Sequence, residues 1–307
     1  MKKKIFLAGG MGMVGSAVKK LLYKNNYNLI TPRSVELDLT NQKKTYEFLK
    51  ENKPDAVINC AAKVGGILAN MESPYTFIMQ NMLIQNNLID SAIKLDIKKF
   101  IFLGSSCVYP KFATQPIKET ELLNGHLEST NQWYAIAKIS GIKSIEAANK
   151  QFNRHYNVLM PPNLFGENDT FHKKNSHVVP SIILKMHEAK LNSDEAITLW
   201  GTGTPKRELM DIDELADCIL FFIKNDMKET IYNVGSGEEI SIRELAQKLK
   251  KITGYKGKIN WDKNMPDGTP RKLMCSKKVN KYGWKYSGNI DKSLEKTYSW
   301  FKKNYPQ

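Results

Sequence analysis

The chain has 307 residues, and its 46 Lys and Arg against 31 Asp and Glu give a formal net charge of +15. Its hydrophobic fraction of 41% and charged fraction of 25% are those of a globular protein, which excludes disorder as the main state. The four cysteines lack the spacing of a metal site or disulfide framework, and no apolar run is long enough to span a bilayer. The composition therefore predicts a folded, cytoplasmic protein that attracts anions, whether nucleic acid, anionic membrane or small phosphorylated ligands.

Short apolar strands alternate with helical segments through the first half of the chain. The expected strands are 4–8, 28–31, 56–60, 100–103 and 157–160, and the expected helices are 12–25, 40 or 41–52, 74–95 and 131–152. Strands separated by helices predict an α/β fold, with a doubly wound parallel sheet of the Rossmann type covered by helices on both faces.

The pattern changes after residues 161–163, where loops lengthen and Pro, Gly and Lys become frequent. The elements expected there are helices near 179–190 and 241–253 and a strand at 231–234 that returns to the first sheet. The sequence thus predicts a first domain at 1–165, completed by 209–236, and a smaller, partly interleaved domain at 166–307.

A glycine-rich turn follows the first strand and opens the first helix. Gly9, Gly12 and Gly15 permit a tight turn and let a pyrophosphate approach the backbone N–H groups at the start of the helix. Met13 and Val14 belong to the same turn. This pattern predicts that the first domain binds a dinucleotide.

Two residues after the second strand compete to select the dinucleotide. Arg33 lies 18 residues after Gly15, near the strand end, and can meet the 2′-phosphate of NADP. Glu36 is the rival, as the acid that bonds the ribose 2′-OH of NAD. We favour NADP, and Asp38 with Leu39 suits the adenine pocket, although Asp38 can equally be a loop acid near the next helix.

Tyr134 and Lys138 are four residues apart, so both lie on one face of the expected helix 131–152. Lys138 can lower the pKa of the tyrosine and hold the nicotinamide ribose, so that Tyr134 exchanges a proton near neutral pH. Ser105 follows the fourth strand at the sheet edge where ligands bind, and Ser106 is its rival. These residues predict hydride transfer, with Tyr134 supplying the proton and Ser105 polarising a carbonyl.

The order of glycine turn, serine and Tyr-x-x-x-Lys resembles the extended short-chain dehydrogenase/reductase superfamily. Longer stretches resemble the GDP-L-fucose synthase family over essentially the whole chain. They are residues 62–67, 104–111, 134–139, 175–180, 200–205 and 266–272. The resemblance implies an NADP(H)-dependent enzyme that binds a GDP-4-keto-6-deoxy sugar, epimerises C3 and C5, and reduces the C4 ketone.

The same resemblance assigns roles to individual residues. Cys107 removes a proton beside the ketone, His177 returns one to the opposite face, and His177 or Lys138 would stabilise the cysteine thiolate. The implied cofactor contacts beyond the glycine turn are Ala61, Pro161, Asn163, Leu164, Lys138 and His177. The implied substrate contacts are Lys185, Trp200, Arg207 and Asp267.

Some of these positions carry particular expectations. Trp200 can stack on guanine, and Arg207 can clamp the diphosphate. Lys185 stands where the family has an arginine, and it keeps the charge but loses bidentate geometry. Met11 stands where the family commonly has a basic residue, which removes one possible contact to a 2′-phosphate.

Other functions remain open at this point. A nucleotide-sugar 4-epimerase or 4,6-dehydratase that recycles NAD would use the same scaffold, although Ser106 and Cys107 stand where dehydratases usually carry Asp and Glu. A non-catalytic nucleic-acid-binding protein would use the basic surface, but no helix–turn–helix, zinc or aromatic-rich RNA motif supports it. The sugar can be a hexose or a heptose. The resemblance also implies a homodimer formed through helices 74–95 and 131–152, with no membrane or nucleic-acid partner and no metal.

Overall fold

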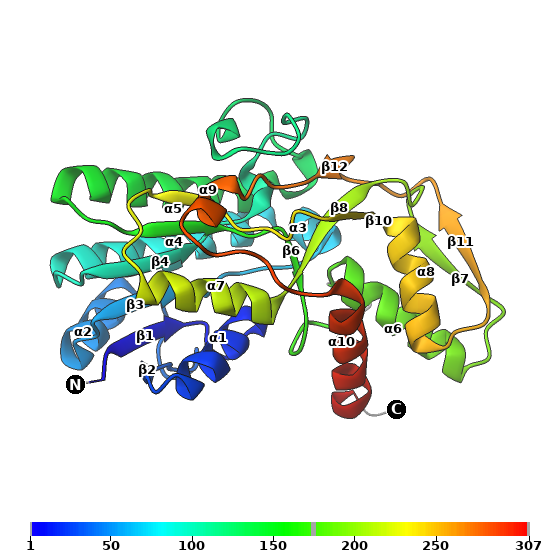
Figure 1. Cartoon of the computed structure of the whole chain (residues 1–307), viewed down its shortest axis with the longest axis horizontal. Helices are drawn as coiled ribbons and strands as arrows, with labels where there is room; N and C mark the ends of the chain where they lie inside the picture. Colours follow the sequence, from blue (N-terminus) through cyan, green and yellow to red (C-terminus); the bar gives the residue numbers. More distant parts are fainter. Residues whose placement is uncertain (1, 173–175, 306–307) are drawn as a thin grey trace.

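Six parallel strands form the central sheet of the larger half of the molecule, in the order β2-β1-β3-β4-β5-β9 (Figure 1). The strands are β1 (Lys4–Ala8), β2 (Asn28–Ile30), β3 (Ala56–Asn59), β4 (Lys99–Leu103), β5 (Asn157–Met160) and β9 (Ile231–Asn233). Each neighbouring pair is parallel. The computed structural model describes residues 2–172 and 176–305, so Asn175 of the 175–180 motif lies outside the described residues.

Helices cover both faces of this sheet, as the sequence predicts. They are α1 (Met13–Lys24) and α7 (Ile212–Lys224) on one face, and α2 (Gln42–Asn52), α4 (Pro74–Lys94) and α5 (Gln132–Phe152) on the other. Successive strand residues point to opposite faces, so Ile5 and Leu7 join the core beneath α1 and α7. Phe6 and Ala8 join the core beneath α4 and α5. The near-continuous apolar strands of the sequence follow from this burial on two sides.

The second half of the chain adds smaller sheets and three longer helices. A mixed sheet contains β6 (Asn163–Phe165), β8 (Lys206–Asp211), β10 (Glu239–Ser241) and β12 (Arg271–Lys272), and β7 (Ala196–Trp200) pairs with β11 (Lys258–Asp262). The helices α6 (Val178–Leu191), α8 (Ile242–Thr253) and α10 (Ile290–Asn304) surround a third apolar cluster. The short elements are α3 (Ile67–Glu72), α9 (Lys277–Lys281), η1 (Ser106–Val108), η2 (Glu119–Glu121) and η3 (Ser129–Asn131).

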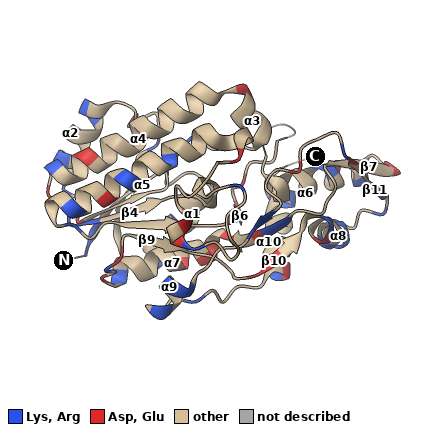
Figure 2. Cartoon of the chain, turned by 90° about the horizontal axis from the view of Figure 1, so that it is seen from above, with Lys and Arg blue, Asp and Glu red and all other residues tan. Residues whose placement is uncertain are grey.

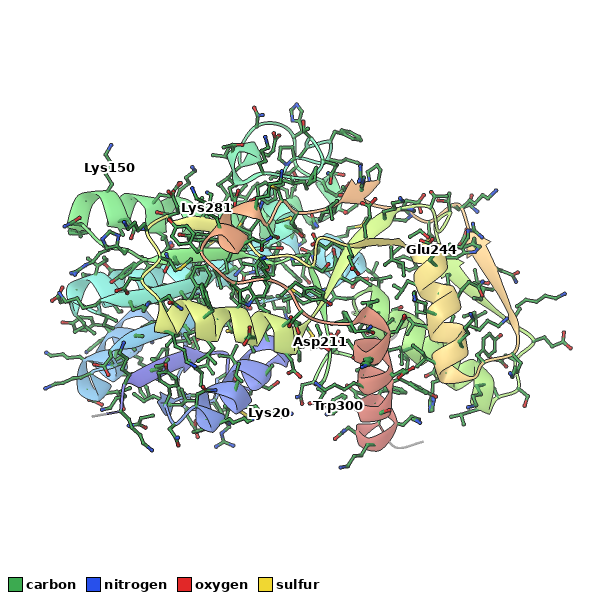
Figure 3. All side chains as sticks on the ribbon, viewed as in Figure 1. Lys20, Lys150, Asp211, Glu244, Lys281 and Trp300 are labelled. Carbon is green, nitrogen blue, oxygen red and sulfur yellow. The ribbon has the colours of Figure 1, made fainter. Side chains whose placement is uncertain are left out.

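The helices and strands expected from the sequence are confirmed, with ends shifted by a residue or two, and β9 does return to the first sheet beside β5. The division at residue 165 stays a prediction. The sequence analysis missed α7 and α10. Their boundaries carried a signal, because Asp211 caps α7 through the backbone N–H of Asp213 at 2.8 Å and Asn289 caps α10. Figure 3 labels Asp211 where α7 begins beside α10.

The positive charge is spread over both halves of the described chain. Figure 2 shows Lys and Arg on most elements, interspersed with Asp and Glu. Many pair locally, as Lys94 does with Asp90 at 2.8 Å and Lys143 with Glu146 at 2.7 Å. Within residues 2–172 and 176–305, no helix combines the length and the apolarity that a bilayer crossing needs.

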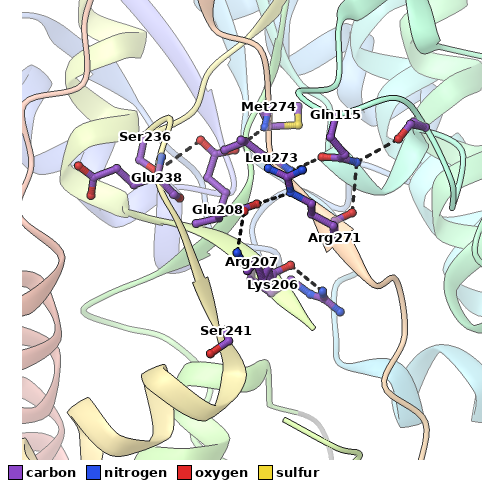
Figure 4. Close-up of polar contacts among 12 residues, drawn as sticks. Gln115, Lys206, Arg207, Glu208, Ser236, Glu238, Ser241, Arg271, Leu273 and Met274 are labelled. Carbon is purple, nitrogen blue, oxygen red and sulfur yellow. Dashed lines mark hydrogen bonds and ion pairs between the residues drawn. The ribbon is translucent and has the colours of Figure 1, made fainter. Parts of the chain in front are cut away.

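Glu208 on β8 ties together three segments of the second half (Figure 4). Its side chain is fully buried and accepts hydrogen bonds from the backbone N–H of Gly237 and of Met274, both at 2.7 Å. These bonds hold the segment after β12 against β8, where Lys272 is the register partner of Arg207. Burial raises the pKa of the Glu208 carboxyl to about 7.

We expect this carboxyl to make the free energy of unfolding fall as pH rises from about 4.5 to about 7. In that window the folded state binds the proton that the unfolded chain has released, so raising the pH favours unfolding, by about 3 kcal/mol in total. Glu208→Gln removes this pH dependence and costs about 1–3 kcal/mol at pH 5, because its amide N–H₂ faces a backbone donor. Urea denaturation at several pH values measures both effects.

Glu238→Gln, at an exposed neighbouring position, is the matched control and should retain the slope of the native protein. An unchanged slope in Glu208→Gln would show that another group titrates.

Candidate active site

The glycine turn and the end of β3 form the floor of a cofactor crevice. Gly9 has a φ of 76°, and a Cβ on it would lie 2.7 Å from the backbone nitrogen of Ala61. A Cβ on Gly15 would lie 2.0 Å from the carbonyl oxygen of Gly9. The two segments meet at the carboxyl edge, where the strand order reverses between β1 and β3. Only glycine lets the turn pack this closely against the backbone at Ala61 and at Gly9 itself, whereas a Cβ on Gly12 would meet nothing closer than 3.4 Å.

The start of α1 completes this cradle. Gly12 is its N-cap, and within the described residues no side chain caps the helix. The N–H groups of the first turn, which includes Met13 and Val14, are therefore available to an anion. The dinucleotide site predicted from the glycine spacing has the geometry it needs.

Arg33 and Glu36, the two rivals for selecting the cofactor, form an ion pair just beyond β2. Arg33 Nη2 lies 2.9 Å from Glu36 Oε1, and Glu36 Oε2 accepts the backbone N–H of Arg33 at 2.7 Å. These hydrogen bonds hold the pKa of Glu36 below its usual value. Nearby, Asp38 accepts hydrogen bonds from the backbone and hydroxyl of Thr40, at 2.9 and 2.7 Å. A cofactor contact of Asp38 or Leu39 stays a prediction.

Ser105, Tyr134 and Lys138 come together at the carboxyl edge of β4. Ser105 follows β4, and its side chain lies near enough to the Tyr134 hydroxyl to favour the ionised phenol. The buried Lys138 donates from Nζ to the carbonyl oxygen of Leu103 at 2.8 Å. Ser106, the rival of Ser105, is buried and its N–H donates to the carbonyl of Pro161 at 3.1 Å. The effect on Tyr134 therefore favours Ser105.

The pKa of Tyr134 shifts in the opposite direction to the one expected from the sequence. The pKa of Tyr134 is raised, because burial of the hydroxyl and the charge of Cys107 outweigh the hydrogen bond from Ser105. Lys138 was expected to lower it. Burial also lowers the pKa of Lys138, to about 8, and its ammonium is held by a strand carbonyl. Desolvation of both groups therefore outweighs their mutual interaction.

The residues after β5 border the same edge. Pro161 follows the last residue of β5, and Asn163 and Leu164 begin β6, where they pair with Leu209 and Met210 of β8. β6 thereby links the carboxyl edge of the large sheet to the strand that carries Arg207. The predicted cofactor residues and substrate residues thus lie on connected elements.

Cys107 lies in η1, two residues beyond Ser105. Asn131 Nδ2 is 3.4 Å from its sulfur, and Lys272 Nζ is 3.8 Å away. Within the described chain these two residues, rather than the expected His177 or Lys138, make the contacts to the thiol. Neither contact was expected from the sequence, because Asn131 and Lys272 lie far from Cys107 along the chain.

His177 is the N-cap of α6, and its Nδ1 lies 3.9 Å from Oδ1 of the buried Asp169. The preceding loop also reaches the cofactor side, since Asn168 Nδ2 donates to Ser16 Oγ on α1 at 3.1 Å. Asp169, which was not expected from the sequence, is thus the acidic neighbour of His177.

The predicted substrate residues lie on the elements of the second half. Arg207 Nη2 donates to the carbonyl of Asp267 at 3.1 Å, and the Asp267 carboxylate accepts from the backbone and hydroxyl of Thr202, both at 2.8 Å. Trp200 ends β7 with 40% of its surface exposed. Lys185 on α6 donates from Nζ to the carbonyl of Thr198 on β7 at 3.1 Å.

Arg207 connects this group to the catalytic edge. Burial lowers the pKa of its guanidinium, and the charges of Cys107 and Asp267 oppose that shift. The thiol and the predicted diphosphate clamp therefore share one electrostatic environment.

This site defines a class of protein. The strand order, the glycine turn and the group of Ser105, Tyr134 and Lys138 are together those of a dinucleotide-dependent enzyme. The model of the NAD dependent epimerase/dehydratase family matches residues 5–235, and the chain belongs to that family. It is 48% identical to GDP-L-fucose synthase 1 of Arabidopsis thaliana, covering 98% of this chain and 94% of that one. It is 42% identical to the GDP-L-fucose synthase of Escherichia coli strain K12, covering 99% and 98%. These likenesses confirm the resemblance drawn from the sequence.

Solved structures agree with this assignment. A GDP-mannoheptose C4 reductase from Campylobacter jejuni with NADP bound aligns with a TM-score of 0.89 and 32% identity. The alignment covers 98% of each chain.

Proposed function

We propose that this enzyme reduces the C4 ketone of a GDP-4-keto-6-deoxy sugar with NADPH, after exchanging protons at C3 and C5. The observation that carries the proposal is the joint placement of Ser105, Tyr134 and Lys138 beside a thiol, Cys107, which in turn shares its surroundings with Arg207. A reductase alone needs the first three residues. The thiol beside them supplies a base for epimerisation.

The residues divide the chemistry between them. Cys107 takes a proton from a carbon beside the ketone, and Ser105 with Tyr134 holds the ketone oxygen as negative charge develops there. His177 returns a proton to the opposite face. In the reduction, NADPH would supply the hydride, and Tyr134 gives its proton to the C4 oxygen while Lys138 holds the nicotinamide ribose.

The cofactor and the sugar nucleotide would occupy different parts of the chain. Residues 1–165 with 209–236 hold NADP(H) through the glycine turn, Ala61 and the segment at 161–164. Residues 166–307 hold the GDP-sugar, with Lys185, Arg207 and Asp267 at the nucleotide diphosphate and Trp200 on guanine. The names of the GDP-L-fucose synthases and of the NADP-bound heptose reductase support the choice of these two ligands.

The test is product analysis by NMR in deuterated water, with GDP-4-keto-6-deoxy hexose and heptose substrates and NADPH. We expect oxidation of NADPH, a C4 alcohol, and deuterium at C3 or C5. Purified protein that carries NAD and consumes no NADPH would instead support an NAD-recycling 4-epimerase or dehydratase.

We expect Arg33→Met to raise KM for NADPH by about 10- to 100-fold, the value of one lost charge-assisted hydrogen bond. The reason is that Arg33 presents a guanidinium just beyond β2, held by Glu36 at 2.9 Å. KM for NADH should stay within about twofold, since NADH has no 2′-phosphate. Initial rates with NADPH and with NADH measure the two KM values. Equal increases for the two cofactors would mean that Arg33 only supports the loop.

We also infer a homodimer formed through α4 and α5. Exposed apolar side chains line one stripe of α4, at Tyr75, Met79 and Leu83, and part of α5, at Trp133 and Ile136. Such residues three or four positions apart share a helix face, and a contiguous exposed apolar surface marks an interaction site.

The double variant Leu83→Glu with Ile136→Glu should convert the dimer to a monomer in size exclusion with light scattering. Tyr23→Glu, at an exposed position of α1, is the matched control and should leave the mass unchanged. A native monomer, or a double variant that stays dimeric, would refute this interface.

A further inference from the structure

Two polar side chains beside the Cys107 thiol, Asn131 and Lys272, have no part in the chemistry proposed so far. Asn131 directs its amide nitrogen at the sulfur from 3.4 Å, and Lys272 directs its ammonium from 3.8 Å. In this arrangement the amide nitrogen and the ammonium can each only donate a hydrogen bond to the sulfur. Donors and positive charge favour a thiolate over a thiol.

Asn131 is held rigidly where η3 meets α5. Its backbone N–H donates to the carbonyl of Glu128 at 3.2 Å, and Tyr134 follows within the first turn of α5. Its Oδ1 is buried and has no hydrogen-bond partner among the described residues. The amide nitrogen of Asn131 thus donates to the sulfur while its amide oxygen stays buried without a partner. An unpaired buried acceptor costs free energy, which points to a role beyond packing.

Lys272 is placed by β12 and by the hydrogen bonds around it. β12 pairs with β8 so that Lys272 lies opposite Arg207, and Glu208 holds the following segment through Met274. Across residues 2–172 and 176–305, no carboxylate forms an ion pair with Lys272, whereas its neighbour Arg271 pairs with Glu239 at 2.7 Å. The charge of Lys272 is therefore not cancelled locally.

We propose that Asn131 and Lys272 are positioning residues that hold Cys107 as a thiolate for proton abstraction. The inference rests on the proposed epimerisation. In that step the C–H bond beside the ketone breaks, an S–H bond forms, and the electron pair moves to the C4 oxygen as an enolate. Lys272 lowers the energy of the thiolate before the step, and Asn131 fixes its direction.

The first test uses the enzyme without substrate, so that binding of the sugar nucleotide cannot affect it. The rate of Cys107 alkylation by iodoacetamide at pH 7, followed by peptide mass mapping, reports the thiolate fraction. We expect Lys272→Met to slow alkylation about fivefold or more, because a charge close to the sulfur is lost. Lys272→Arg should restore most of the rate. Lys263→Met, at an exposed position after β11, is the matched control and should react like the native protein.

The second test measures deuterium exchange at C3 and C5 as a function of pH. We expect the exchange optimum of Lys272→Met to move to higher pH, and exchange in Asn131→Ser to slow, while both variants still reduce a pre-epimerised substrate. Native alkylation rates in Lys272→Met would overturn the proposal. Absence of exchange in the native enzyme would instead refute the proposed epimerisation, and the alkylation rates would still decide whether Lys272 stabilises the thiolate.

Discussion

Tyr134→Phe should lower kcat for NADPH oxidation by about 10²- to 10⁴-fold, the usual contribution of one general acid. In the proposed reaction the phenol is the proton donor, and phenylalanine keeps the ring but removes the proton. Because Lys138 bonds to the carbonyl of Leu103 rather than to the tyrosine oxygen, its position should not change. Steady-state rates with a GDP-4-keto sugar measure the loss.

Two controls separate chemistry from folding in this variant. NADPH binding, followed by fluorescence titration, should stay within a few fold, since the glycine cradle is untouched. Tyr23→Phe, on the exposed surface of α1, should keep full activity. Normal turnover of Tyr134→Phe would remove Tyr134 from the catalytic role.

Cys107→Ser should lower deuterium incorporation at C3 and C5 by about 10²- to 10⁴-fold, because a serine hydroxyl is far less acidic than a thiol and makes a poor base at neutral pH. Ser105, Tyr134 and Lys138 remain in place, so reduction of a pre-epimerised substrate should change only a few fold. NMR in deuterated water measures the exchange, and NADPH oxidation measures the reduction. The two activities should therefore separate in one variant.

Cys275→Ser is the matched control, because Cys275 is bound through its backbone N–H, which donates to the carbonyl of Ile117, and not through its thiol. It should retain both activities. Equal loss of exchange and reduction in Cys107→Ser would contradict a dedicated epimerisation base.

The elements of the first half were predictable because short apolar strands alternate there with long helical segments between turn residues. β1 alternates between two buried faces, and α4 and α5 repeat apolar residues at helical spacing. α7 was not expected from the sequence, although its buried apolar residues recur at helical spacing and its polar residues lie on the opposite side. Its N-cap was a second signal.

The catalytic site, too, was only partly predictable from the sequence. The spacing of Tyr134 and Lys138 follows from helix geometry alone, and the turn at Gly9 follows a recognisable strand. The pKa of Tyr134 depends instead on burial, which opposes the expected shift and which no local pattern reports. Likewise Asn131 and Lys272 reach Cys107 from distant segments.

By itself the sequence determined the class of fold, the dinucleotide turn and the Ser-Tyr-Lys group, because each depends on contacts between residues close in the chain or on the ends of parallel strands. Tertiary structure alone decided which cation meets Cys107 and how Glu208 fixes β8 against the segment after β12. The tertiary structure also decided where the residues behind the net charge of +15 lie. Most of that charge is spread over the surface, while folding brings Lys272 and Arg207, both partly buried, to the surroundings of one thiol, where water screens charge less.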